Sequence, residues 1–205
     1  MKIIFATGNQ GKMREIREIM KDLPVEVLSM KEAGITVDID ENGTTFEENA
    51  AIKARTVYQA ANQLGLQGIV IADDSGLEID ALNKEPGIYS ARYMGEDTPY
   101  SEKNKNLIDR LEGVEDDKRT ARFVCAIAAV LPDGETVTTR ATIEGRIGYE
   151  EMGTNGFGYD PIFYVPEYQC STAELTMEQK NAISHRGKAL KAMKETIQKM
   201  LMDER

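Results

Sequence analysis

The chain has 205 residues, of which 41% are hydrophobic and 29% charged, as in an ordinary globular domain rather than a disordered chain. Its 25 Lys and Arg against 35 Asp and Glu give a formal net charge of -10, and no basic stripe is present, so nucleic acid is excluded as the main partner. The apolar run at the N-terminus covers only residues 3–6, too short for a signal peptide or a membrane span. We therefore expect a cytoplasmic protein without a membrane partner.

The first half of the chain alternates strand and helix patterns. Thr45 and Glu48 stand three residues apart, which is typical of a capping box at the start of a helix. The next apolar run is expected to end at a turn containing Asp73, Asp74 and Gly76. The predicted strands cover residues 2–6, 25–30, 35–39, 69–72 and, after this turn, 77–79; the predicted helices cover residues 10–22 and 46–64.

In the second half, two strands are predicted around a Pro-Asp-Gly turn, and a loop rich in glycine and aromatic residues follows. The strands cover residues 121–131 and 136–147, the ordered loop 153–166, and the helices 101–111, a piece from about 176, and a longer segment after 184. Interleaved helices and strands predict an α/β fold, a mixed sheet flanked by helices, with residues 1–205 as one large domain or two lobes sharing a core.

The loop after the first strand carries glycines and a lysine directly before a helix. Such a loop can hold an anion, because glycine lets the backbone approach closely and the helix start offers N–H groups. It is not a Walker A loop, since the spacer between the glycines and the Gly-Lys-Ser/Thr ending are both missing. In a chain of net charge -10, a small anion bound together with a divalent metal is the expected ligand. The loop residues are Thr7, Gly8, Asn9, Gln10, Gly11 and Lys12.

Two acidic clusters are candidates for holding Mg²⁺, which prefers oxygen ligands. Asp73 and Asp74 end an apolar strand, where open α/β sheets bind their ligands, but an isolated Asp-Asp-Ser-Gly is a solvated turn about as often. Side chains alternate along a strand, so the two carboxylates point the same way only if the chain turns, for instance at Gly76. Asp38, Asp40 and Glu41 form the second cluster, for which a solvated loop is the simpler interpretation.

Other polar residues have a structural and a functional interpretation. Asn49 and Lys53 share a helix face at i,i+4 spacing and can reach a phosphate, although a solvent face is the simpler account. The segment Phe157, Gly158, Tyr159 and Asp160 offers an aromatic ring for stacking a nucleobase, or is simply an aromatic-packed surface turn.

The last polar group lies near the predicted C-terminal helix. His185 is the only histidine, so a two-histidine metal site is excluded, and no Gly-x-Ser-x-Gly supports a serine hydrolase. Lys180 and Arg186 only donate hydrogen bonds and would favour keto oxygens on a base over the amine of adenine, while helix capping is the alternative. Cys125 lies in an apolar run and Cys170 in a polar loop, so a disulfide is not expected.

Taken together, six short motifs resemble one known family. The chain is similar to the inosine triphosphate pyrophosphatases, the Ham1-like pyrophosphatases that act on non-standard purine nucleoside triphosphates. Each motif is weak alone, but they occur in the family's order over nearly the whole chain. They are Ala-Thr-Gly-Asn-x-x-Lys at 6–12, Thr-Phe-x-Glu-Asn-Ala-x-x-Lys-Ala at 45–54, Ala-Asp-Asp-Ser-Gly-Leu at 72–77, Pro-Gly-Ile-Tyr-Ser-Ala-Arg-Tyr at 86–93, Gly-Phe-Gly-Tyr-Asp-Pro at 156–161 and Ser-His-Arg at 184–186.

The resemblance implies two lobes around a central substrate cleft, a homodimer, and Mg²⁺-dependent cleavage of ITP, dITP and XTP to the monophosphate and pyrophosphate. It implies that Asp74 is the catalytic carboxylate and a metal ligand, that Asp40 or Glu41 is a second ligand, and that Ser75 touches substrate. It assigns the triphosphate to residues 7–12. It assigns the base and sugar to Phe157, Gly158, Tyr159, Asp160, Lys180, His185 and Arg186.

Two rival functions are weighed against this one. A nucleotide-binding regulator would use the same residues without hydrolysis, but it has no need of paired carboxylates beside a phosphate loop. A Mg²⁺ phosphatase would instead release orthophosphate. In our hypothesis, water attacks the α-phosphorus in line, Asp74 orients or deprotonates this water, and Mg²⁺ and Lys12 offset charge on the phosphates.

Overall fold

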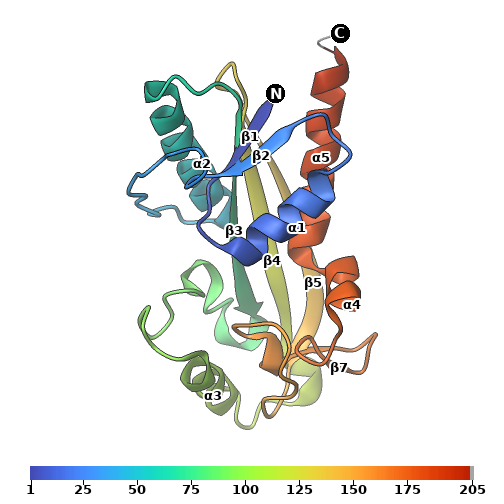
Figure 1. The fold of residues 1–205 in the computed structure, drawn as a ribbon. Helices are drawn as coiled ribbons and strands as arrows, with labels where there is room; N and C mark the ends of the chain where they lie inside the picture. The colour runs from blue at the N-terminus through green and yellow to red at the C-terminus, as the bar shows by residue number, and fades with distance from the viewer. Residues whose placement is uncertain (204–205) are drawn as a thin grey trace. The chain divides into compact units, whose positions relative to one another are not determined.

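The computed structural model describes residues 1–203, which form an α/β fold around one mixed sheet (Figure 1). The sheet has seven strands in the order β2-β1-β3-β4-β5-β6-β7. This confirms the predicted fold class. The strands are β1 (Lys2–Phe5), β2 (Glu26–Ser29), β3 (Ile69–Ile79), β4 (Thr120–Val130), β5 (Thr136–Ile147), β6 (Phe163–Val165) and β7 (Cys170–Ser171).

Five α-helices and four short 3₁₀ turns are found among the described residues. The α-helices are α1 (Gln10–Met20), α2 (Phe46–Gln63), α3 (Tyr100–Arg110), α4 (Met177–Ile183) and α5 (His185–Asp203). The 3₁₀ turns are η1 (Asp80–Leu82), η2 (Gly87–Tyr89), η3 (Asp116–Lys118) and η4 (Asp160–Ile162). No helix within residues 1–203 is long and apolar enough to cross a membrane.

The chain divides into two compact units, and the divisions in β3, β4 and β5 fall inside the strands. Unit 1 contains residues 1–74, 125–141 and 186–205; unit 2 contains residues 75–124 and 142–185. Each unit has a hydrophobic core of its own. The two lobes that the resemblance implies therefore have counterparts in the structure.

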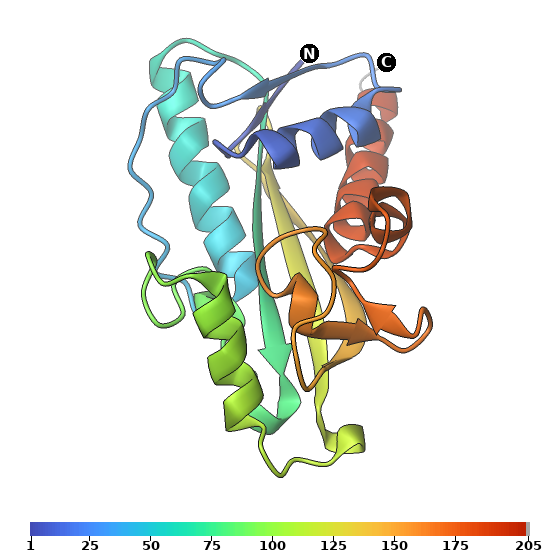
Figure 2. The same cartoon turned by 60° about the horizontal axis from the view of Figure 1, so that its bottom comes forward.

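In unit 1, helices cover both faces of the sheet. Strand β1 pairs in parallel with β2 and with β3. Helices α1 and α5 pack on one face, and α2 lies on the other (Figures 1 and 2). The spacing of Met13, Ile16 and Met20 puts these side chains on one stripe of α1, facing the sheet residues Ile69 and Ile71. Every second residue of β3 within unit 1 therefore faces α1 and α5.

Unit 2 is held by α3, the 3₁₀ turns and the two short strands β6 and β7. Its core combines Leu107 of α3 and Leu111, the C-cap of that helix, with Phe163 of β6 and Leu77 of β3. Arg119 is only 1% exposed and donates to the main-chain oxygens of Leu111, Ile147 and Gly148 at 2.7–2.9 Å. The buried guanidinium thus joins the end of α3 to the end of β5, with each of its three bonds satisfying a main-chain carbonyl.

Most predicted elements are confirmed, including both helices after residue 176 and the Thr45 cap, whose hydroxyl accepts from the Glu48 N–H at 3.1 Å. Three predictions were wrong. Residues 35–39 form no strand, although Ile35 is buried. Residues 69–79 form one continuous strand, so the chain does not turn at Gly76. The loop 153–166 contains the short strand β6.

Neither Cys125, which is buried, nor Cys170, which is half-buried, forms a disulfide, as expected.

Candidate active site

Strand β3 brings two adjacent carboxylates into different surroundings. Because side chains alternate along a continuous strand, Asp73 points to the face of α1 and α5, where Ile69 and Ile71 also point. Asp74 points to the face that α2 covers. All the groups that surround these two carboxylates in the following paragraphs belong to unit 1.

Asp73 is the centre of a buried cluster of cations. The Lys12 ammonium donates to both oxygens of the Asp73 carboxylate, at 3.0 and 2.8 Å, and Arg186 Nε donates to Oδ2 at 3.3 Å. Burial alone would raise the pKa of Asp73, which is 2% exposed. The positive charges of Lys12, Arg186 and Lys53 together outweigh burial and hold this pKa well below its usual range. Asp73 is therefore ionised at any physiological pH and pairs with the cationic side chains of Lys12 on α1 and Arg186 on α5.

Asp74 is affected in the opposite direction. Burial raises its pKa most, the charge of Lys53 lowers it, the charge of Glu41 raises it, and hydrogen bonding by Asn49 lowers it. The result is a pKa of about 6. A carboxylate of this kind is ionised near neutral pH but takes up a proton more readily than an ordinary aspartate, which suits a general base.

Lys53 connects β3 with the acidic segment before α2, which contains Asp38, Asp40 and Glu41. Its ammonium lies 3.1 Å from Glu41 Oε2 and donates to the main-chain oxygen of Asp73, also at 3.1 Å. The Lys53 side chain is 14% exposed. Asn49, one helical turn earlier, is fully buried and accepts from the Gly43 N–H at 2.9 Å, which holds the acidic segment against α2.

Asp40 and Glu41 were both predicted to hold metal together with Asp74. Of these two, only the charge of Glu41 is close enough to Asp74 to raise its pKa. Asp40 is exposed and accepts from the Asn42 side chain at 3.3 Å. Within residues 1–203, no group of three or more His, Cys, Asp or Glu side chains is placed to hold a metal ion. A cation at Asp74 and Glu41 would therefore have two protein carboxylates.

The loop of residues 7–12 is organised around Asn9, the N-cap of α1. The Asn9 side-chain oxygen accepts from the N–H groups of Gly11 and Lys12 at 2.8 and 3.1 Å, and the Asn9 N–H donates to Thr7 Oγ1 at 3.1 Å. Gly8 and Gln10 are exposed. Because the cap already uses two helix N–H groups, the Lys12 ammonium and the exposed backbone are what the loop offers to an anion.

In unit 2, Asp160 organises the aromatic loop. Its carboxylate is buried and accepts from the Phe157 N–H at 2.8 Å, from the Lys180 ammonium at 2.5 Å and from the Thr172 hydroxyl at 2.9 Å. The Lys180 ammonium also lies 5.2 Å from the centre of the Phe157 ring. Phe157 itself is 64% exposed, which leaves its ring accessible for stacking.

The other predicted residues of unit 2 are placed differently. Tyr159 is buried, and its hydroxyl donates to the Ser90 main-chain oxygen at 2.6 Å, so this tyrosine supports the loop from inside. The His185 ring stacks on that of Phe123, with 5.1 Å between the two ring centres. Ser75 is half-buried and follows Asp74 in β3.

Comparison with known proteins places nearly the whole chain in one family. The family described as the Ham1 family matches residues 3–196. The chain belongs to the Ham1 family. The family resemblance predicted from the six motifs is thereby confirmed.

Relatives of this Ham1-family chain include two named dITP/XTP pyrophosphatase. The one from Clostridium perfringens is 47% identical over 201 residues, which cover 98% of both chains. The one from Thermoanaerobacter pseudethanolicus is 50% identical over 201 residues, with the same coverage. Among solved structures, a HAM1 protein from Coxiella burnetii and the Ham1 protein of Staphylococcus aureus each align with a TM-score of 0.87 at 42% identity. They cover 97% and 98% of this chain, and 99% and 100% of their own.

Two residues of the candidate site are more buried than the sequence pattern indicated. A solvent face was the simpler interpretation of Asn49 and Lys53, and it was wrong, because both side chains face Asp74 and the acidic segment. Their i,i+4 spacing was visible, but it does not say which face of α2 packs on the sheet. Glu15, 3.6 Å from Arg186, and Thr172 carried no signal in the sequence.

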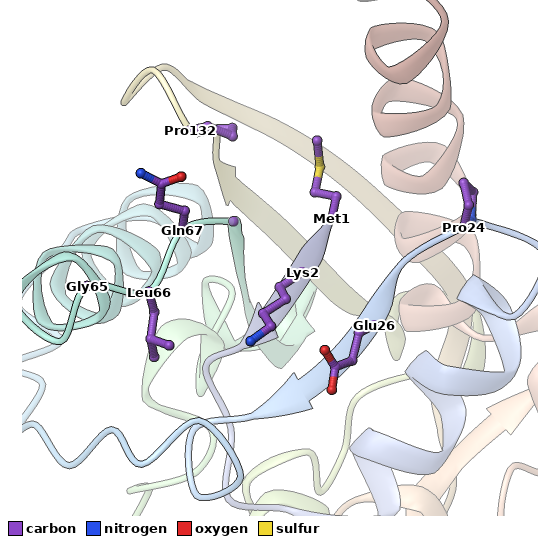
Figure 3. Close-up of a pocket in the computed structure, with 9 residues that line it drawn as sticks. Met1, Lys2, Pro24, Glu26, Gly65, Leu66, Gln67 and Pro132 are labelled. Carbon is purple, nitrogen blue, oxygen red and sulfur yellow. The ribbon is translucent and has the colours of Figure 1, made fainter.

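A separate hollow in unit 1 contains none of the predicted residues. It lies where β1 begins, whereas the loop of residues 7–12 follows the end of β1 (Figure 3). Lys2 and Glu26 are its charged side chains. The lining residues are Met1, Lys2, Pro24, Glu26, Gly65, Leu66, Gln67, Gly68 and Pro132.

Proposed function

We propose that this Ham1-family chain hydrolyses ITP, dITP and XTP between the α and β phosphates, releasing the nucleoside monophosphate and pyrophosphate. The observation that carries the proposal is the difference between two adjacent aspartates of β3. Asp73 pairs with the side chains of Lys12 and Arg186, whereas the pKa of Asp74 is raised to about 6. The relatives named dITP/XTP pyrophosphatase support the same substrate class.

Mg²⁺ fits the donors on the α2 side of β3. Glu41 and Asp74 supply carboxylate oxygens, and Mg²⁺ commonly takes one or two carboxylates, with water and substrate phosphate oxygens as its other ligands. Two neighbouring negative charges in a partly buried place also favour a cation. When bound, Mg²⁺ would offset negative charge on the phosphate oxygens. Asp40 has no comparable contact, so Glu41 is our choice for the second ligand.

The chain's own groups account for the rest of the reaction. Asp74 takes a proton from water as the water oxygen forms its bond to the α-phosphorus, and the bond between this phosphorus and the bridging oxygen breaks. The electrons of that bond leave with pyrophosphate. Lys12 and Lys53 lie close enough to the carboxylates to interact with the phosphates of a substrate held there. No side-chain nucleophile is required.

Groups in unit 2 suit a purine with keto oxygens. The exposed Phe157 ring can stack a base, and the Lys180 ammonium, held by Asp160, can only donate hydrogen bonds. Lys180 would thus favour the keto oxygen of hypoxanthine or xanthine over the amine of adenine. Arg186 contacts Asp73 and Glu15 in unit 1, so its assignment to the base, like that of His185, stays a prediction.

The test is incubation of the purified protein with ITP, dITP, XTP, ATP or GTP and Mg²⁺, followed by identification of the phosphate product. We expect pyrophosphate, with ITP, dITP and XTP consumed faster than ATP and GTP. Release of orthophosphate would indicate a phosphatase, and binding without turnover would indicate a regulator; either result refutes the proposal. Asp74→Asn is the control for contaminating activity.

We also propose a homodimer, as the family resemblance implies, and a cytoplasmic location, as expected from the sequence. Size-exclusion chromatography with light scattering tests the dimer, and a mass of one chain at micromolar concentration would refute it.

A further inference from the structure

Helix α3 lies directly against the aromatic loop of unit 2, although no motif of the sequence pointed to α3. Asn104 on α3 is 1% exposed, and its amide nitrogen donates to the Gly158 main-chain oxygen at 3.2 Å and to Glu151 Oε1 at 2.6 Å. These bonds join α3 to the two ends of the segment that contains Phe157. A buried amide that donates both of its hydrogen bonds to one loop constrains that loop strongly.

The same amide carries an energetic cost. Within the described residues, Asn104 Oδ1 is buried and accepts no hydrogen bond. A buried acceptor without a donor destabilises the folded state. The cost is tolerated at a position that contacts the loop bearing the most exposed phenylalanine ring.

A tyrosine one turn earlier on α3 supports the loop from the same side. The Tyr100 ring meets Tyr159 edge to face at 5.2 Å. It also lies 3.5 Å from the place where a Cβ on Gly158 would stand. Gly158 has a φ of +68°, which favours glycine, so the loop conformation depends on support from outside rather than on its own backbone preference. Asn104 thus fixes the main chain, and Tyr100 fixes the ring that follows it.

We propose that Asn104 and Tyr100 are positioning residues that hold Gly158, and with it Phe157, in the geometry that stacks the purine base. This inference rests on the proposed function for its substrate and on unit 2 alone for its geometry. Neither residue touches the base itself; both act through the loop. Losing them should weaken binding of the base while leaving the phosphate-handling groups of unit 1 unchanged.

The first test is Asn104→Leu, which keeps the side-chain volume and removes both donors. We expect KM for ITP to rise about tenfold, as for loss of one good stacking contact, with kcat within about twofold of wild type. The inhibition constant of inorganic tripolyphosphate, which has no base, should stay unchanged. Lys105→Ala, an exposed neighbour on α3, is the matched control. A folded Asn104→Leu protein with unchanged KM for ITP would refute the proposal, as would an equal loss of tripolyphosphate affinity.

A second pair of variants covers the case in which Asn104→Leu does not fold. Tyr100 is 37% exposed, so the fold should tolerate its replacement. Tyr100→Phe keeps the ring and should behave as wild type, whereas Tyr100→Leu should raise KM for ITP. Equal behaviour of the two variants would contradict a role for the ring.

A further readout does not depend on activity. The chain has no tryptophan, so Phe157→Trp places a single fluorophore on the loop. Adding Asn104→Leu to this protein should shift the emission and increase quenching by iodide, and identical spectra would refute the positioning role. If the wild-type protein fails to hydrolyse ITP, the proposed function is wrong, while this fluorescence comparison still decides whether Asn104 positions the loop.

Discussion

Asp73 and Asp74 are neighbours in β3, yet the Asp73 carboxylate bonds to Lys12 on α1 while that of Asp74 faces Asn49 and Lys53 on α2. The alternation of a continuous strand produces this separation. It lets one carboxylate be permanently ionised and paired while the next has a pKa of about 6. The fold thus places two chemically different groups one residue apart.

Isosteric changes at the two positions should therefore have different effects. Asp73→Asn leaves Lys12 and Arg186 without their buried counter-charge, and we expect the free energy of unfolding to fall by about 3–5 kcal/mol. Asp74→Asn should fold normally but lower kcat for ITP by about 10²–10⁴-fold, because the general base is lost. Urea denaturation and steady-state kinetics on both variants check this. Near-normal turnover by a folded Asp74→Asn protein would remove Asp74 from the mechanism.

The raised pKa of Asp74 predicts how stability changes with pH in the absence of metal. Because its pKa rises from 3.8 in the unfolded chain to about 6 in the folded state, the folded state binds this proton more tightly. The favourable effect is present below pH 4 and is lost as pH rises through 6. Asp74→Asn, which cannot ionise, should thus be more stable than wild type by about 2–3 kcal/mol at pH 8 and equal to it near pH 4. Urea denaturation with a chelator tests this, and a constant difference between the two proteins would contradict the assigned pKa.

The sequence predicted the main parts of this arrangement but not their packing. The strand before Asp73, the helix after Thr45 and the family were all predicted correctly. A turn at Gly76 was predicted because glycine after two aspartates commonly marks one. The burial of Leu77 and Ile79 in the core of unit 2, which extends the strand, depends on contacts distant in the sequence.

The segment 35–39 shows why an alternating pattern can mislead. Ile35 is buried and its neighbour Thr36 is exposed, as in a strand, but no other strand pairs with this segment within the described residues. The pattern records which side chains are buried, whereas a strand also requires a hydrogen-bonding partner. Likewise, the i,i+4 spacing of Asn49 and Lys53 could not tell which face of α2 meets β3. The roles of the individual site residues stay predictions.

The two candidate metal ligands before α2 can be separated by their dependence on Mg²⁺. Glu41 raises the pKa of Asp74 and pairs with Lys53, whereas Asp40 bonds locally to Asn42. We expect Glu41→Gln to raise the Mg²⁺ concentration for half-maximal ITP hydrolysis about tenfold or more, since a second carboxylate ligand is lost. Asp40→Asn should change it less than about twofold, as expected for an exposed charge. The reverse ranking would transfer the ligand role to Asp40.

The ion pair between Asp160 and Lys180, which we call the clamp, requires glycine at position 156. A Cβ there would stand 2.2 Å from Asp160 Oδ2 and 3.0 Å from the Lys180 ammonium, and the φ of Gly156 is +78°. Gly156→Ala should therefore displace the ammonium that we assign to the keto oxygen and raise KM for ITP, with little change in the inhibition constant of tripolyphosphate. Gly134→Ala is the matched control, because Gly134 has a φ of +90° but open space around the added methyl group. Both variants should lose about 1 kcal/mol of stability from backbone strain. Only Gly156→Ala should lose preference for ITP over ATP, and an equal effect of both variants would show that strain rather than the clamp is responsible.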